Sequence, residues 1–131
     1  MTQIPHNALV VVADGGGATL FRNTGSGGEL TLKEERKLSP KDLSEEGPSG
    51  SRPEDQSPRQ TDEATFAKQL VQMLHKMSNG NKFSDLVIVA DPQTLGQMRS
   101  AMHKTVESSV VRSLAKDLTN HSVAEITKAL Q

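Results

Sequence analysis

The sequence predicts an α/β protein built on a mixed β-sheet, and three observations support this fold class. Three short β-type segments precede a long polar stretch at residues 39–60. After that stretch, helical patterns alternate with a strongly apolar run that fits a buried strand. The chain has 131 residues, the length of one domain, so we expect residues 1–131 to form a single domain.

The first two segments predict a β-hairpin. Residues 9–13 are a continuous apolar run, which fits a strand buried on both faces. The run ends at Asp14 and the three glycines 15–17, which fit a tight turn. Residues 18–22 then supply the second strand. The triple glycine could also cradle a phosphate, but no P-loop Lys-Ser/Thr pair follows it, so a hairpin turn is the better interpretation.

The third segment predicts an edge strand. Residues 23–28 are rich in glycine and fit a second turn. In residues 29–37, Leu30 and Leu32 alternate with polar residues before charged residues take over. Such a strand buries one face only, and its charges discourage further pairing.

The polar stretch from Ser39 to Gln60 is unlike the rest of the chain. Its 22 residues hold one strong hydrophobe, Leu43, and four of the six prolines. Such a composition buries too little apolar surface to offset the entropy of ordering the chain. We therefore expect a mobile polar loop at residues 39–60.

A helix and a buried strand follow the polar stretch. Thr61 can cap a helix that ends at Asn79-Gly80. Residues 86–90 form the most hydrophobic run of the chain, which predicts a strand inside the sheet. The helix has one apolar stripe, at Phe66, Leu70, Met73, Leu74 and Met77.

The last third of the chain predicts two more helices around an ambiguous segment. Asp91-Pro92 supplies an N-cap and a first-turn proline, and Leu95, Met98 and Met102 would face inward. Residues 105–118 fit either a helical stripe or a strand through Leu114. Ser122 and Glu125 form a capping box, with Val123, Ile126 and Leu130 as the apolar face of the final helix.

Composition excludes several classes of function. The chain has no Cys, Trp or Tyr, so it offers no disulfide scaffold, thiolate metal site, cysteine nucleophile or Tyr/Trp stacking platform. Its formal net charge is −1, without the basic excess typical of nucleic-acid-binding proteins. The N-terminus has no signal-peptide pattern and no run long enough to span a membrane, so we expect a cytoplasmic protein without a membrane partner.

Several short motifs resemble one bacterial family. They are Val11-Val12-Ala13-Asp14-Gly15, Ala18-Thr19-Leu20-Phe21-Arg22-Asn23, Leu86-Val87-Ile88-Val89-Ala90-Asp91-Pro92, Thr94-Leu95-Gly96-x-x-Arg99 and Lys116-Asp117-Leu118-Thr119-Asn120-His121. Together they are similar to the family named "protein required for attachment to host cells", over nearly the whole chain. That family is in turn similar to the middle domain of eukaryotic and archaeal peptide-chain release factors and their bacterial relatives.

The resemblance implies a ribonuclease-H-like mixed sheet with the order βββ-loop-αβαβα. It therefore favours a fifth strand at Val110–Ala115. In release factors, the loop after the third strand carries Gly-Gly-Gln, the tripeptide that promotes ester hydrolysis on the ribosome. The corresponding stretch 39–60 has no Gly-Gly-Gln, so the resemblance does not extend to that activity.

Two groups of residues are candidates for a functional site. Strand-to-helix junctions of α/β sheets commonly bind ligands, which makes the junction after residue 90 a candidate for recognition. Simple helix capping, with Leu95 in the core, Gly96 allowing close packing and Arg99 solvated, is the alternative, and we favour it. With the last family motif, the candidate ligand- or partner-binding residues are Asp91, Thr94, Gly96, Arg99, Lys116, Asp117, Thr119 and His121.

Three aspartates could instead serve a metal. Asp14, Asp91 and Asp117 each follow a predicted strand, and clustered carboxylates at one end of a sheet are what a Mg²⁺-dependent nuclease uses. Aspartate is equally common in turns and at N-caps, and we favour that interpretation. We expect no cofactor and assign no catalytic residue.

Three functions follow, in order of preference. The first is a non-enzymatic binding or adaptor protein of the host-attachment family, with an unknown protein partner. The second is a ribosome- or RNA-associated factor related to the release-factor middle domain. The third is a metal-dependent nuclease. The sequence does not specify an oligomeric state.

Overall fold

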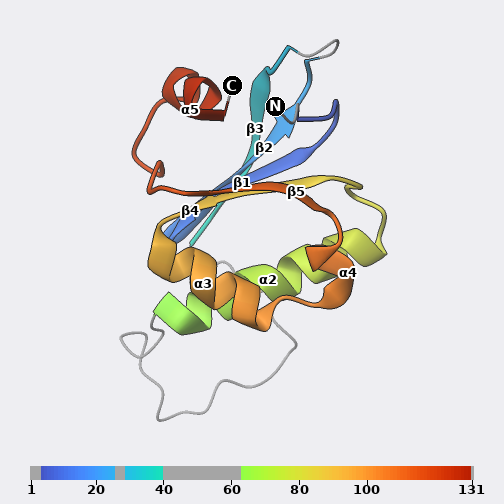
Figure 1. The fold of residues 1–131 in the computed structure, drawn as a ribbon, viewed down its shortest axis with the longest axis vertical. Helices are drawn as coiled ribbons and strands as arrows, with labels where there is room; N and C mark the ends of the chain where they lie inside the picture. Colours follow the sequence, from blue (N-terminus) through green and yellow to red (C-terminus); the bar gives the residue numbers. More distant parts are fainter. Residues whose placement is uncertain (1–3, 26–28, 40–62, 131) are drawn as a thin grey trace.

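The computed structural model describes residues 4–25, 29–39 and 63–130. These residues form a five-stranded mixed sheet with helices on both faces (Figure 1). The α/β prediction is therefore confirmed. The elements are β1 (Leu9–Asp14), β2 (Gly17–Asn23), β3 (Leu32–Leu38), α2 (Glu63–Asn79), β4 (Leu86–Ala90), α3 (Pro92–Ala101), α4 (Lys104–Glu107), β5 (Val110–Ala115) and α5 (Val123–Leu130).

The sheet has the strand order β3-β2-β1-β4-β5. β1, β2 and β3 pair antiparallel, whereas β4 is parallel to both β1 and β5. The apolar segments β1 and β4 lie inside the sheet, where both faces of a strand are covered, and this explains their unbroken hydrophobic sequences. β3 and β5 are the edge strands.

The two faces of the sheet hold separate hydrophobic clusters. On one face, Leu9 and Val11 of β1 pack with Phe66 and Leu70 of α2 and with residues of α3 and α4. On the other face, α5 packs on alternate residues of the same strands (Figure 1). Because side chains alternate along a strand, β1 and β4 contribute to both clusters.

The ambiguous residues 105–118 contain both kinds of structure. A short helix, α4, occupies Lys104–Glu107, and β5 begins three residues later. Val106 is buried on the face of the sheet that α2 and α3 cover, whereas β5 pairs with β4 along its length. The fifth strand suggested by the resemblance is therefore present, and the helical pattern belongs to α4 only.

Two further expectations differ from the structure. The third strand begins at Leu32 rather than at residue 29, although its exposed, charged character is confirmed. The sequence predicts Val123 on the apolar face of α5, but this residue is 40% exposed. It is the first residue of that helix and lines a pocket. The expected Thr61 cap and nearly all of the 39–60 loop lie outside the described residues.

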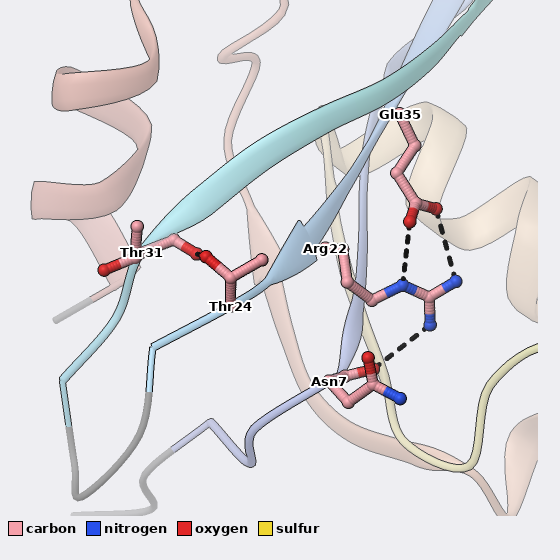
Figure 2. Close-up of polar contacts among 5 residues, drawn as sticks. All are labelled: Asn7, Arg22, Thr24, Thr31 and Glu35. Carbon is pink, nitrogen blue, oxygen red and sulfur yellow. Dashed lines mark hydrogen bonds and ion pairs between the residues drawn. The ribbon is translucent and has the colours of Figure 1, made fainter.

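Arg22 joins β2 to β3 through an ion pair and to the N-terminal segment through a hydrogen bond. The guanidinium of Arg22 donates to both carboxylate oxygens of Glu35, at 3.1 and 3.2 Å, and to the backbone carbonyl of Asn7 at 3.1 Å (Figure 2). A bidentate pair of this kind fixes geometry as well as adding energy. In the described part of the chain, no helix is long and apolar enough to cross a membrane.

Candidate functional site at the carboxyl end of the sheet

The strand register brings distant parts of the chain to one end of the sheet. Ala13 pairs with Ala18 and with Ala90, Ala18 pairs with Leu38, and Ala90 pairs with Ala115. This row of residues defines the end of the sheet at which β1, β3, β4 and β5 finish, called the carboxyl end below. The residues that follow those strands, including Asp14, Asp91 and Lys116, therefore emerge together.

Thr119 joins two of the family-like motifs at the carboxyl end. Its hydroxyl oxygen lies 2.9 Å from Asp14 Oδ2 and 2.6 Å from Asp117 Oδ1. A hydroxyl has one hydrogen, so it donates to one carboxylate at a time. Asp14 also accepts the backbone N–H of Gly16 at 2.7 Å, which holds the glycine turn against the same group.

The hydrogen bonds of Thr119 also affect the acidity of Asp117. The hydroxyl and the backbone N–H of Thr119 both favour the ionised carboxylate, and together they lower the pKa of Asp117 below its ordinary value. The side-chain bond is the larger cause. Asp117 is exposed, so this carboxylate is a charged group presented to solvent at neutral pH.

The junction after β4 is built as a helix cap. Asp91 Oδ2 accepts the backbone N–H of Thr94 at 3.1 Å, and Pro92 occupies the first turn of α3. Asp91 Oδ1 and Thr94 Oγ1 are buried, and neither has a hydrogen-bond partner among the described residues. A Cβ at Gly96 would meet nothing within 4 Å, so the expected role of Gly96 in close packing is wrong.

Arg99 does not belong to this group. It is the eighth residue of α3, about 10 Å along the helix axis from Pro92. Its guanidinium donates to Ser113 Oγ of β5 at 2.6 Å. There Arg99 borders a cavity of about 380 Å³ that lies between β5 and the helices α3 and α4.

His121 borders a small pocket on the α5 face of the sheet. The pocket has a volume of about 180 Å³ and lies next to the Thr119 bridge. His121 Nδ1 is 3.6 Å from Glu125 Oε1, and the His121 side chain is 44% exposed. The lining comprises Val12, Thr19, Phe21, Glu34, Lys37, Thr119, His121, Ser122, Val123 and Ile126.

Sequence reasoning missed the contribution of β3 to this pocket. Glu34 and Lys37 both line it, although a regular strand would turn residues three apart to opposite faces. A register shift between Leu20 and Phe21 accounts for this, because Leu20 pairs with Arg36 whereas Phe21 pairs with Glu34. A bulge inside an otherwise regular alternation leaves no clear signal in the sequence.

The three aspartates do not form a metal cluster. In residues 4–25, 29–39 and 63–130, no three His, Cys, Asp or Glu side chains lie close enough together to hold one metal ion. Asp14 and Asp117 share Thr119, whereas the carboxylate of Asp91 caps α3. At the carboxyl end, the Asp14 and Asp117 carboxylates thus share one hydroxyl group.

Residues 7–130 match the sequence profile of bacterial archaeo-eukaryotic release factor family 12. The chain belongs to this family. It is also 30% identical, over 66 residues, to the uncharacterized protein RP470 of Rickettsia prowazekii, an alignment that covers 49% of the chain and 44% of that relative. The chain thus spans less than half the length of this relative.

The polar stretch 39–60 follows β3, the third strand of the chain. Its N-terminal neighbour Leu38 lies in the terminal row of the carboxyl end. The candidate site therefore lies where the polar stretch leaves the sheet.

Proposed function

We propose that this protein is a ribosome-associated binding factor of the release-factor family, and that the carboxyl end of its sheet contacts the ribosome. The observation that carries the proposal is the convergence of the Asp14–Thr119–Asp117 group with the start of the 39–60 stretch at one end of the sheet. A role on the ribosome would place the protein in the cytoplasm.

Two exposed lysines give this surface the charge that RNA contacts need. Lys37 is next to the last residue of β3, and Lys116 directly follows β5, so both lie at the carboxyl end. Lysine ammonium groups contact phosphate oxygens without reading sequence. Since the net charge of the chain is −1, binding would depend on this local patch and would weaken with salt.

Co-sedimentation with ribosomes tests the proposal. Lys37→Glu and Lys116→Glu should each lower the ribosome-bound fraction at low salt, because each replaces a cation at the surface with an anion. Lys82→Glu is the matched control: Lys82 is also exposed but precedes β4, at the opposite end of the sheet. Equal losses in all three variants, or a chain found only in the free fraction at low salt, would refute the proposed surface.

The proposal does not include peptide release by the family tripeptide. The sequence contains no Gly-Gly-Gln at any position. We expect purified protein to leave peptidyl-tRNA on a stalled ribosome intact, even when it is bound. Release of the peptide at a rate above that of buffer alone would contradict this expectation.

A second function, as a host-attachment adaptor that binds one protein partner, is favoured by a different observation. Thr119 and His121 belong to the motif that resembles the attachment family, and both line the 180 Å³ pocket. Capture experiments with the full chain and with a chain lacking residues 40–60 would test it. A protein that is retained by both chains and lost with His121→Ala would support this function, whereas retention of ribosomal proteins alone would contradict it.

A further inference from the structure

The cavity of about 380 Å³ beside β5 is separate from the surface proposed for the ribosome. It lies where the chain turns from α3 into α4, and these two helices lie on the same face of the sheet (Figure 1). Its volume falls in the range of about 300–1,000 Å³ that is usual for small-molecule sites. The described lining residues are Ile88, Arg99, Met102, Glu107, Val110 and Ser113.

A register shift in β5 gives this cavity its floor. Leu86 of β4 pairs with Val110 of β5. Ile88, the next residue on that face of β4, pairs with Ser113 rather than with residue 112. Val110 and Ser113 therefore face the same side of the sheet, although residues three apart in a regular strand face opposite sides. Ile88 is almost fully buried, and Val110 and Met102 pack on the same hydrophobic cluster, so most of the floor is apolar.

Arg99 places a cation at the cavity. Its Nη2 donates to Ser113 Oγ at 2.6 Å, which fixes the position of the guanidinium. A guanidinium has further N–H donors, whose fork matches the two oxygens of a carboxylate. Among residues 4–25, 29–39 and 63–130, Arg99 has no carboxylate partner. The group is thus held in place with donors available for an anionic ligand, which lowers the cost of binding.

Glu107 places the opposite charge at the same cavity. It is the last residue of α4 and is exposed. Within the described part of the chain it forms no ion pair, and Arg99 and Glu107 do not pair with each other. The cavity therefore combines a cation, an anion and an apolar floor, and neither charge is neutralised by the other.

We propose that this cavity binds a free α-amino acid with an apolar side chain. Such a molecule carries a carboxylate for Arg99, an ammonium group for Glu107 and an apolar group for the floor, all on one carbon atom. A carboxylic acid without the ammonium group places like charge beside Glu107, and an amine without the carboxylate does so beside Arg99. A residue inside a peptide carries neither charge. The proposed site does not depend on the ribosome contact, because the two surfaces share no residue named here.

Titration of the full chain with leucine, followed by ¹⁵N NMR, tests the proposal. Leucine should shift amides within residues 99–113 in a saturable manner. Glycine has both charges but cannot cover the floor, so it should bind about tenfold more weakly or less. 4-Methylpentanoate lacks the ammonium group and 3-methylbutylamine lacks the carboxylate, so each should also lose about tenfold or more in affinity.

Two results of this titration would overturn the proposal. One is the absence of a saturable shift with leucine, valine and methionine alike. The other is binding of N-acetyl-leucinamide as tight as that of leucine, because the occupant would then be a segment of a peptide chain rather than a free amino acid.

Two substitutions of exposed side chains test which residue binds which charge. Glu107→Gln should bind leucine and 4-methylpentanoate equally tightly, because the group that distinguishes the two ligands is gone. Arg99→Gln should bind leucine and 3-methylbutylamine equally tightly for the same reason. Lys104→Gln, on α4 but outside the described lining, is the control and should keep the full preference for leucine.

A preference for leucine that survived in both substituted chains would refute the assignment of the two charges. Ribosome co-sedimentation of the same variants separates this proposal from the proposed function. Both variants should sediment with ribosomes as the unaltered chain does, so that amino-acid binding and ribosome binding can each fail without the other.

Discussion

At the residue scale, Asn23 is the polar side chain on which the hairpin depends most. It is fully buried, and its amide nitrogen donates to the carbonyls of Ile4 and Pro5 at 3.1 and 2.9 Å. Its side-chain oxygen accepts the backbone N–H groups of Gly25 and Thr31 at 3.0 and 3.1 Å. All four bonding positions of the amide are thus filled, and they join the N-terminal segment and the end of β2 to the residues that flank the connection between β2 and β3.

Replacement of Asn23 should therefore be costly. Asn23→Ala would leave four backbone groups without their partner, and we expect a loss of about 2–4 kcal/mol in the free energy of unfolding. Urea denaturation followed by far-ultraviolet circular dichroism measures it. Thr24→Ala, at the exposed neighbour, is the control and should change stability by less than about 0.5 kcal/mol. Equal effects at the two positions would contradict the role assigned to Asn23.

The acidity of Asp117 provides a second prediction at this scale. Thr119→Val removes the hydroxyl that is the main cause of the lowered pKa of Asp117, so this pKa should rise toward its ordinary value. A carboxylate with a lowered folded-state pKa stabilises the fold above its unfolded pKa, and this contribution is lost as the pH falls through the folded-state pKa. Thr119→Val should therefore make stability less sensitive to acid.

Carboxyl NMR titration measures this effect directly. Glu125 serves as the internal reference, because its lowered pKa is caused by the backbone N–H and hydroxyl of Ser122 and not by Thr119. The pKa of Glu125 should stay unchanged in Thr119→Val and should rise in Ser122→Ala. If Thr119→Val left the pKa of Asp117 in place, the hydrogen bond would not be its cause.

At the element scale, α3 depends on its N-cap. Asp91 accepts the N–H of Thr94 and precedes a proline, and the first turn of the helix has no other acidic residue. Asp91→Ala should cost about 1 kcal/mol, and Asp91→Asn should recover most of it, because both Asp and Asn accept the same bond. Thermal unfolding of the three proteins checks this. An Asn variant as unstable as the Ala variant would show that Asp91 acts through its charge instead.

Most elements could be predicted from the sequence because their patterns are local. The apolar runs of β1 and β4, the stripe of α2 and the capping box before α5 each indicate one type of structure. Residues 105–118 were ambiguous because a four-residue helix and a strand share one stretch of β-branched residues. The role of Asn23 could not be predicted either. An Asn before a glycine-rich segment is typical of a turn, and its hydrogen-bond partners lie up to 19 residues away in the sequence.

The candidate site was predictable only in part, because tertiary register decides which residues meet. Asp14 and Asp117 each follow a strand, and both accept from the hydroxyl of Thr119. The contact between Thr119 and Asp14 spans 105 residues of sequence, so no local pattern predicts it. Arg99 was grouped with Asp91 by sequence proximity, although it lies on the far part of the helix and contacts β5. Lys37 was missed because a register shift, invisible in the pattern, turns it into the pocket.

At the scale of the whole molecule, the two hydrophobic clusters are coupled through the strands that they share. Alternate residues of β1 belong to the α2 side and to the α5 side, and β4 is divided in the same way. Neither helical layer can lose its packing without exposing a face of the same strands. That residues 1–131 form a single domain stays a prediction, which the unfolding of the two layers can test.

We therefore predict that both layers unfold in one transition. Leu70→Ala on the α2 side and Ile126→Ala on the α5 side should each cost about 2–5 kcal/mol, because both side chains are almost completely buried. Each variant should lower the denaturation midpoint of every element equally. Because the chain lacks Trp and Tyr, ¹⁵N NMR along a urea series is the suitable measurement. In Ile126→Ala, the amides of α5 could lose their native signals at a lower urea concentration than the amides of β1 and α2. The two faces would then unfold independently, and the prediction of a single domain would be wrong.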